Sequence, residues 1–402
     1  LEFRRVLFRS VVAGYKAFTA GASTINLQTS ALTDDVPLTV AAVSAQVTSV
    51  TVAFDGGFGT ASITNFATPE RIWWANGETI CARYRVAAPT PGATALEAVI
   101  DIHACSTRAM VEVVIENCKL VGLEAPNATP PTSYSGRAIT TPAAASYTAA
   151  VVSVNGTAVA TINGNGAPEL AHAFGRSVYA KAWVNGDPGL RVTQLHTDLQ
   201  KHPLLFKCDQ AATFNMAGYA GDNYNPWSTG RHRATGMGGG GDHASIGPLP
   251  QWEAHALQSG DFRAWNATES SALAVLGYNI NYRDAATGLV PCASQLVKRA
   301  QGSSEANFPN IGANAMGWEV AHSPACGLMA FASRPSPIFI ELAQKIAVWN
   351  ATKLGKSTNI SGWAGSISLA DNTTGILSIS NSEYQMRGFA WGFRALAHAT
   401  FL

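Results

Sequence analysis

The spacing of hydrophobic residues changes near residue 200, and this change limits the chain to folds that combine strands with helices. From about Ser23 to Asp198, apolar residues alternate with other residues in short runs, as in strands with one buried face. After about Lys201 they recur at intervals of three and four residues, which is the spacing of one helix face. The sequence therefore predicts a multidomain β plus α protein, with an antiparallel β-sandwich over residues 11–200 and a helical domain over residues 201–402.

Individual strands can be placed in the first half. Glu97–His103 and Met110–Glu116 are strand-length runs rich in β-branched residues. Two Asn-Gly pairs predict tight hairpins, because Asn and Gly tolerate the positive φ angles of a type I′ turn. The first hairpin is expected to join 151–154 to 157–162, and the second to join 177–184 to 190–196.

Four segments of the second half are expected to be helices: Leu249–Leu257, Phe262–Leu276, Ile338–Trp349 and Glu383–Phe401. Pro248 and Pro337 directly precede the first and the third of them, where the fixed φ of proline suits the start of a helix. In the last segment one face carries Phe389, Phe393 and Leu396, and another carries Arg387, Trp391, Arg394 and His398. On an exposed face, Arg387 and Arg394 would pair with Glu383 or meet solvent. Glu253 and Glu341 are expected to be surface carboxylates.

Composition excludes several classes of protein. The 27 Lys and Arg residues nearly balance the 26 Asp and Glu residues, so the chain has no strong basic excess for binding nucleic acid. No apolar run reaches the ~18–20 residues of a membrane-spanning helix. The six cysteines form no CxxC pair, so a zinc ribbon or a thioredoxin-type site is not expected. No cluster of metal ligands is evident in the sequence, and no cofactor is expected. Cys105 and Cys118 could form a disulfide, although free thiols are the commoner outcome.

The first ten residues, Leu1–Ser10, resemble the in-frame translation of a short-read sequencing-library adapter. We therefore treat residues 1–10 as an artefact and expect a metagenomic fragment whose natural N-terminus is missing. Because the helical pattern continues to Leu402, the helical domain is expected to be truncated as well.

The densest group of polar and aromatic residues lies in the glycine-rich stretch from residue 215 to 242. Gly238–Gly241 is followed by Asp242 and His243 rather than by Lys and Ser or Thr, which excludes a phosphate-binding P-loop. Aromatic and charged side chains on a loop held by helices are typical of a sugar-binding cleft. The competing interpretation is a mobile surface loop.

Several short motifs in the helical half resemble one protein group. They are Ile246-Gly247-Pro248-Leu249-Pro250-x-Trp252, Tyr282-Arg283-Asp284-x-x-Thr287-Gly288, Ala321-His322-Ser323-Pro324, Ile340-Glu341-Leu342-Ala343-Gln344 and Arg387-Gly388-x-Ala390-Trp391. Together they resemble the helical part of proteins related to exo-acting rhamnogalacturonan lyases. The resemblance covers residues 200–402 and implies a β-sandwich joined to an incomplete α/α toroid.

The resemblance implies β-elimination at a uronate, in which a base removes the proton beside the sugar carboxylate while cationic or amide groups neutralise that carboxylate. The candidates for acid and base roles are His243, Tyr282 and His322. The candidates for substrate binding are Asn223, Arg231, Arg283 and Arg387, together with Tyr224, Trp227 and Trp391, whose rings could stack on sugars.

Two other functions remain open. One is a non-catalytic glycan-binding or phage-type structural protein. The other is a glycoside hydrolase, which needs two facing carboxylates; Asp222 and Asp242 are available, and they could also hold Ca²⁺ if they converge. We favour the lyase, with a polysaccharide or oligosaccharide as partner and a secreted, periplasmic or virion-associated location. The sequence defines no oligomeric state.

Overall fold

The computed structural model of this chain describes most of both halves. The described residues are 36–123, 140–163, 172–188, 193–201, 205–209, 215–228, 230–232, 244–292, 295, 318, 324–354 and 386–402.

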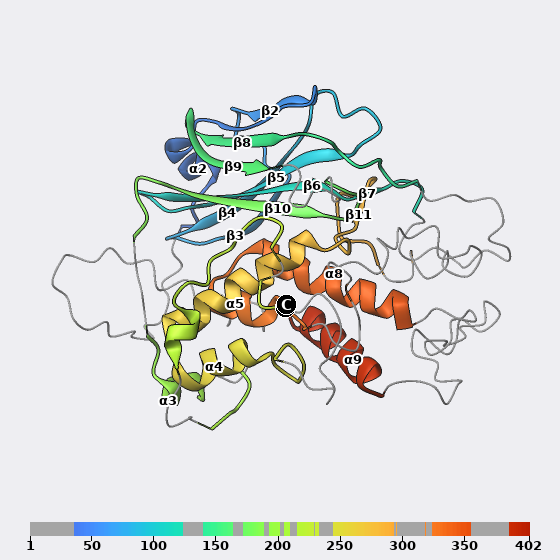
Figure 1. Cartoon of the computed structure of the whole chain (residues 1–402). Coiled ribbons are helices and arrows are strands. Elements are labelled where there is room, and N and C mark those ends of the chain that lie inside the picture. The colour runs from blue at the N-terminus through green and yellow to red at the C-terminus, as the bar shows by residue number, and fades with distance from the viewer. Residues whose placement is uncertain are drawn as a thin grey trace, which may run out of the picture.

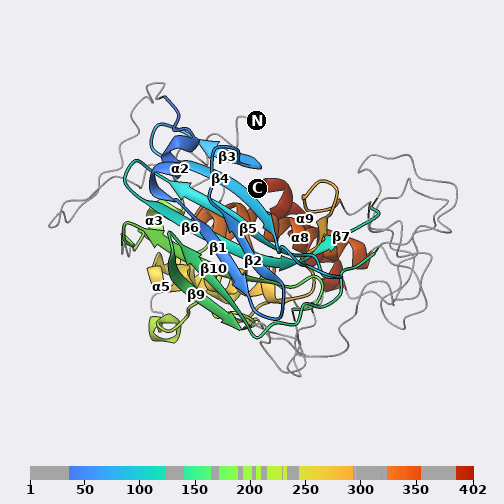
Figure 2. The ribbon, with the colours of Figure 1, turned by 90° about the horizontal axis from the view of Figure 1, so that it is seen from above.

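Two antiparallel sheets form the first part of the molecule (Figures 1 and 2). The four-stranded sheet has the order β2-β1-β8-β9, with β1 Val50–Phe54, β2 Gly59–Ile63, β8 Ala149–Val154 and β9 Thr157–Asn163. The five-stranded sheet has the order β10-β6-β5-β4-β3, with β3 Arg71–Ala75, β4 Ile80–Ala87, β5 Leu96–Ala104, β6 Ala109–Asn117 and β10 Ser177–Val184. A short parallel pair joins β7 Lys119–Leu120 to β11 Arg283–Asp284.

Helices dominate the second part and lie beneath the five-stranded sheet in Figure 1. The described α-helices of this part are α3 His196–Leu199, α4 Gln251–Ser259, α5 Phe262–Ala274, α7 Leu328–Ser333, α8 Pro337–Leu354 and α9 Met386–Phe401, whereas α2 Val40–Gln46 belongs to the first part and precedes β1. Two 3₁₀ turns are η1 Met216–Tyr219 and η2 Val275–Gly277. The predicted mixture of antiparallel sheets followed by helices is confirmed. None of the helices in the described segments combines the length and hydropathy needed to cross a membrane.

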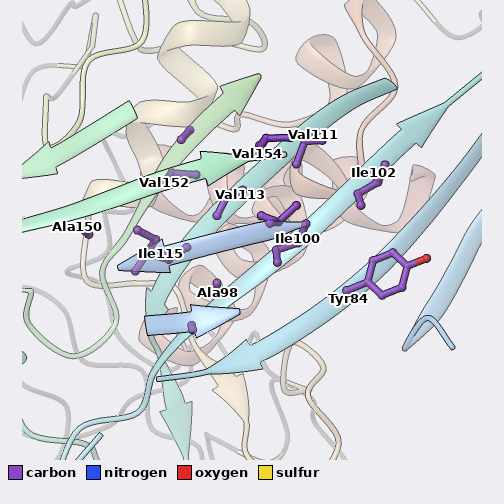
Figure 3. Packing of buried hydrophobic residues seen from close by; sticks show 14 of the residues in the cluster. Tyr84, Ala98, Ile100, Ile102, Val111, Val113, Ile115, Ala150, Val152 and Val154 are labelled. Atoms are coloured by element: carbon purple, nitrogen blue, oxygen red, sulfur yellow. The ribbon is translucent and has the colours of Figure 1, made fainter. Parts of the chain in front are cut away.

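The two sheets share one hydrophobic core (Figure 3). Because side chains alternate between the faces of a strand, β1 sends Val50, Val52 and Phe54 into this core. Strands β5 and β6 contribute Ala98, Ile100, Ile102, Val111, Val113 and Ile115. Burial of each large aliphatic side chain stabilises the fold by about 1.5–3 kcal/mol, so this core holds the sheets together.

The opposite face of the five-stranded sheet is buried under the helices although it carries many charges. On β5 and β6 the alternate positions hold Glu97, Asp101, Glu112 and Glu116. Apolar contacts between the same strands and the helices come from Val99 and Val114, and from Tyr179 on β10. The acidic residues therefore need cationic partners, since an unpaired buried charge is strongly unfavourable. Glu97 and Asp101 find theirs within the sheet part, and Glu112 and Glu116 find theirs in the helical half.

Arg283 supplies the most deeply buried of these partners. Its side chain is 0% exposed and its Nε lies 2.6 Å from Glu116 Oε2, while its Nη2 lies 3.0 Å from Glu341 Oε2 on α8. Lys345 of α8 also reaches Glu116, at 3.2 Å between Nζ and Oε1. Although burial opposes ionisation, Arg283 and Lys345 hold the pKa of Glu116 below its usual range. Glu116 is therefore charged and paired.

Two further arginines complete the buried network. Arg83 of β4 pairs with Asp101 at 2.7 Å between Nη2 and Oδ2, and with Glu341 through Nη1. Arg334, directly after α7, lies 2.7 Å from Glu112 and 2.8 Å from Glu269. The sheet and the helices are thus joined by ion pairs between residues far apart in the sequence.

The structure confirms the first predicted hairpin and part of the second. Asn155 and Gly156 have φ angles of 51° and 77° and connect β8 to β9. Asn185 and Gly186 also have positive φ angles, of 64° and 89°, after β10. The expected return strand is wrong over its described part, because His196 begins α3 and β10 pairs with β6 instead.

Several expectations about exposure are wrong. Glu253 and Glu341 are buried rather than on the helix surface, because their helices pack against other elements on the sides that carry them. The polar face of α9 is turned inward, with Arg394 and His398 buried, whereas Phe393 is exposed. All six cysteines are free thiols, so the possible bond between Cys105 and Cys118 is not formed. Helix α8 begins at Pro337, as predicted.

The substitution Arg283→Met tests the role of the buried network. Removing this cation leaves the Glu116 and Glu341 carboxylates with fewer partners, and we expect a loss of about 3–5 kcal/mol in the free energy of unfolding. Urea unfolding, monitored by circular dichroism, measures this change in the free energy of unfolding. The matched control is Arg263→Met, which removes a surface pair with Asp261 and should change stability far less. Equal effects of the two substitutions would contradict this role.

Candidate functional site

A tyrosine and a histidine from separate segments meet at the outer side of the helical half. Tyr219 is the last residue of η1, which is capped by the Asn215 side chain accepting from the Ala217 backbone N–H at 3.1 Å. His255 lies on α4. The Tyr219 Oη and the His255 Nδ1 are 2.6 Å apart, which is a short hydrogen bond between two groups able to transfer protons.

Helix α4 is fixed at its C-terminal end by a residue that has to be glycine. Gly260 has a φ of 65°, and a Cβ there would lie 1.7 Å from the carbonyl oxygen of Gln194. The Gly260 N–H bonds to Ala256 O, and its own carbonyl accepts from the Gln194 N–H at 2.8 Å. These contacts set where α4 ends and therefore how it presents His255.

Arg231 places a positive charge over the tyrosine ring. Its Cζ lies 4.2 Å from the centroid of Tyr219, while its Nε pairs with Asp222 and its Nη2 donates to Gly218 O. The Asp222 backbone carbonyl in turn accepts from the Asn266 side chain of α5. The side chains of Arg231 and Asp222 are 31% and 22% exposed, so this cluster meets solvent.

The surroundings fix the protonation of both groups at neutral pH. Burial, together with the charge of Arg231, lowers the pKa of His255, so its imidazole is neutral. Burial raises the pKa of Tyr219, with Arg231 partly opposing it, so the phenol keeps its proton. With the neutral imidazole protonated at Nε2, the phenol O–H donates to His255 Nδ1. Transfer of that proton would give a tyrosinate, which the adjacent guanidinium stabilises, and an imidazolium, which the same guanidinium disfavours.

Among the predicted binding residues, Arg231 belongs to this cluster and Asn223 is exposed next to Asp222. Tyr224 is turned toward the sheet, because its Oη accepts from the Tyr179 backbone N–H at 3.0 Å. Trp227 packs in the core between the sheets, with Nε1 2.5 Å from Asn163 O. Contacts within the protein therefore occupy Tyr224 and Trp227, which does not favour stacking of their rings on sugars.

The remaining predicted residues are not brought to the Tyr219–His255 pair in the described segments. Tyr282 is 3% exposed and stacks on Phe174 at 5.3 Å between centroids. Arg283 is fully buried between carboxylates, which does not favour a role in binding substrate. Trp391 is half-buried under Arg394 at 4.7 Å. His243, His322 and the side chain of Arg387 lie outside the described residues.

The pair at the centre of the site was missed in the sequence. Tyr219 belongs to the polar stretch from residue 215 to 242 but carried no assigned role, and His255 was one histidine on a predicted helix. The only local signal is that His255 is a polar residue on the predicted helix α4. In the structure the neighbouring Glu253 and Ala256 are buried, whereas His255 is only partly buried. The contact itself joins positions 36 residues apart.

Two other chemistries find no support in the described segments. No group of three or more His, Cys, Asp or Glu residues there is placed to hold a metal ion. Asp222 is paired with Arg231, and its suggested partner Asp242 lies outside the described residues. The described residues therefore do not test whether Asp222 and Asp242 converge.

Comparison with known family models, curated proteins and solved structures finds no match to this chain. The chemistry of the site is therefore inferred from its own side chains, which offer a proton donor, a neutral acceptor and a cation.

The His255 imidazole gives a direct test of this electrostatic arrangement. We expect its pKa, measured by NMR titration, to lie below the usual histidine value, because burial and Arg231 disfavour the imidazolium. In Arg231→Gln the pKa should rise, since one of these two causes is removed. His255→Gln assigns the resonance. A pKa of His255 that is unchanged in Arg231→Gln would contradict the arrangement.

Proposed function

We propose that this chain is a polysaccharide-lyase-like enzyme that cleaves a uronate-containing glycan by β-elimination. The observation that carries the proposal is the 2.6 Å contact between Tyr219 Oη and His255 Nδ1 beneath the guanidinium of Arg231. The reaction needs a group that can remove and return a proton and a cation that can neutralise a carboxylate. The cluster contains both.

In the proposed reaction, Tyr219 passes its phenol proton to His255 and the tyrosinate takes the proton beside the uronate carboxylate. The electron pair of that C–H bond forms the new C=C bond, and the C–O bond to the leaving sugar breaks. The departing oxygen takes the proton now held by Tyr219, and His255 returns its proton to the tyrosinate. Protons and electrons balance without another reactant, and His255 acts as the temporary proton store.

Arg231 would neutralise the substrate carboxylate during this reaction. Its Nε and Nη2 are engaged by Asp222 and Gly218 O, and no described residue bonds its Nη1, which can bind an oxygen of the substrate. Asn223, exposed beside Asp222, would add an amide donor. The anionic charge that develops on the uronate would then lie beside a fixed cation, which lowers the barrier to proton removal.

The architecture we propose is a β-sandwich followed by an incomplete α/α toroid. The hydrophobic core shared by the two sheets supports the first part. The packing of α4 against α5 and of α8 against α9 supports the second. A boundary near residue 200 is consistent with the end of β10 at Val184 and the start of α3 at His196. The substrate would be a polysaccharide or oligosaccharide met in a secreted, periplasmic or virion-associated setting.

The proposal predicts an unsaturated product that absorbs ultraviolet light when the protein is mixed with a pectic or other uronate-rich glycan. Tyr219→Phe removes the transferable proton and should lower the rate by at least about a hundredfold. The matched control is Tyr84→Phe on β4, which removes a phenol bonded to Phe66 O and should leave the rate unchanged. Arg231→Gln should lower kcat by a similar factor.

Two outcomes would contradict the lyase. New reducing ends without ultraviolet absorbance would favour a glycoside hydrolase. Binding of glycans without turnover, unchanged in Tyr219→Phe, would favour a non-catalytic glycan-binding or structural protein. Absence of product over a panel of uronate-rich glycans would also reject the proposal.

A further inference from the structure

One row of side chains crosses the helix-facing side of the five-stranded sheet, near the turn that joins β5 to β6. The strand register places Trp183 of β10 opposite Met110 of β6, and Met110 opposite His103 of β5. It continues from His103 to Cys81 of β4 and from Cys81 to Trp74 of β3. Side chains paired in this way share one face of the sheet. The row therefore brings two tryptophans and a histidine from separate strands onto one surface.

This row is more accessible than the one beside it. In the neighbouring row, Arg83, Asp101 and Glu112 are opposite one another and are buried beneath the helices. Trp183, in contrast, is only half-buried, and the His103 side chain keeps 10% of its surface exposed. The helices therefore leave this end of the sheet face partly open to solvent.

A buried carboxylate fixes the orientation of His103. Its Nε2 lies 2.7 Å from Glu112 Oε2, and Glu112 also accepts from Ser336 and pairs with Arg334. Although burial opposes ionisation, Arg334 and the hydrogen bond from His103 hold the pKa of Glu112 well below its usual range. The ionised carboxylate keeps the imidazole proton on Nε2. In the neutral imidazole, Nδ1, to which no described residue is bonded, can then accept a hydrogen bond from a ligand.

A lysine extends this surface along β10. Lys181 is more exposed than its neighbours on the strand and precedes Trp183 by two residues, so both lie on one face about 7 Å apart along the strand. The two acids Glu112 and Glu269 act on it but already pair with Arg334. Partial burial and then Arg334 lower the pKa of the lysine in spite of the nearby acids. In the described part of the chain, its amine forms no hydrogen bond or ion pair.

The spacing of these groups suits a chain of sugars. Trp183 and His103 lie on strands separated only by β6, which places them about 9.5 Å apart across the sheet, so one oligosaccharide can contact both. An indole ring packs on the apolar face of a sugar, and an imidazole nitrogen accepts from a hydroxyl group. The Lys181 ammonium binds a carboxylate, which a neutral sugar lacks.

We propose that Trp183, His103 and Lys181 form a surface that binds an acidic oligosaccharide. The sugar chain would lie across β10, β6 and β5, with one ring on the indole and a carboxylate beside the ammonium. This surface is built from other elements than the Tyr219–His255 pair, which comes from η1 and α4. The choice of a uronate-containing ligand rests on the proposed function, whereas binding at this surface requires no turnover.

NMR titration of the Trp183 indole N–H tests the proposal, with tetragalacturonate as the acidic probe and cellotetraose as the neutral one. The titration uses Tyr219→Phe, so that the probe is not consumed, and Trp183→Phe assigns the resonance. We expect tetragalacturonate to shift the Trp183 resonance in a saturable way. The internal control is the indole of Trp227, which is buried between the sheets and should not shift.

The charge of Lys181 is tested by the same titration. Lys181→Gln should weaken the binding of tetragalacturonate at least about threefold, because the ammonium is lost, and should leave the weaker binding of cellotetraose unchanged. The matched control is Lys201→Gln, which removes an exposed lysine paired with Asp198 and should leave both affinities unchanged.

Three results would overturn the surface: a Trp183 resonance that tetragalacturonate does not shift, equal affinities for the acidic and neutral probes, or an unchanged affinity in Lys181→Gln. Failure of the lyase proposal has a different signature, since the unmodified protein would then give no unsaturated product while the Trp183 resonance still shifts. Product formation without a shift of Trp183 would reject the surface alone.

Discussion

The buried ion pairs between the five-stranded sheet and the helices are the constraint on which the rest of the structure depends. A sheet face that carries Asp101, Glu112 and Glu116 cannot be covered by an ordinary apolar helix surface. It requires cations at matching positions, and Arg283, Arg334 and Lys345 supply them. These pairs hold β11, the end of α7 and α8 on the sheet. Helix α5 packs against α7 and α8, and α4, which carries His255, packs against α5.

Local pattern carried much of the information about the fold. Alternation in 97–103 and 110–116 marked β5 and β6, and three- and four-residue spacing marked α4, α5, α8 and α9. The same pattern misled where charge was buried in pairs. Glu253, Glu341 and Arg394 had the polarity of surface residues, and their burial follows from contacts between distant segments that no local window contains.

The candidate site was less accessible to prediction than the fold. Arg231 was chosen for its charge within a polar stretch, and it does lie beside Tyr219. His255 could not be chosen, because its role follows only from the way in which η1 packs beside α4. Arg283 shows the opposite case. It stands in a conspicuous Tyr-Arg-Asp motif, yet Arg283 and Asp284 form strand β11, and the Arg283 guanidinium pairs with the Glu116 carboxylate of the sheet.

The parallel pair of β7 and β11 has a consequence for how such a chain can change over evolutionary time. A strand from the helical half is hydrogen-bonded beside the sheet, and the arginine of that strand neutralises a carboxylate on β6. If either half were exchanged for an unrelated domain, buried charges on the other half would therefore lose their partners. Although the sequence divides near residue 200 into two patterns, we expect the two parts to evolve as one unit. A substitution that changes a charge on one side of the interface would then need a matching substitution on the other side.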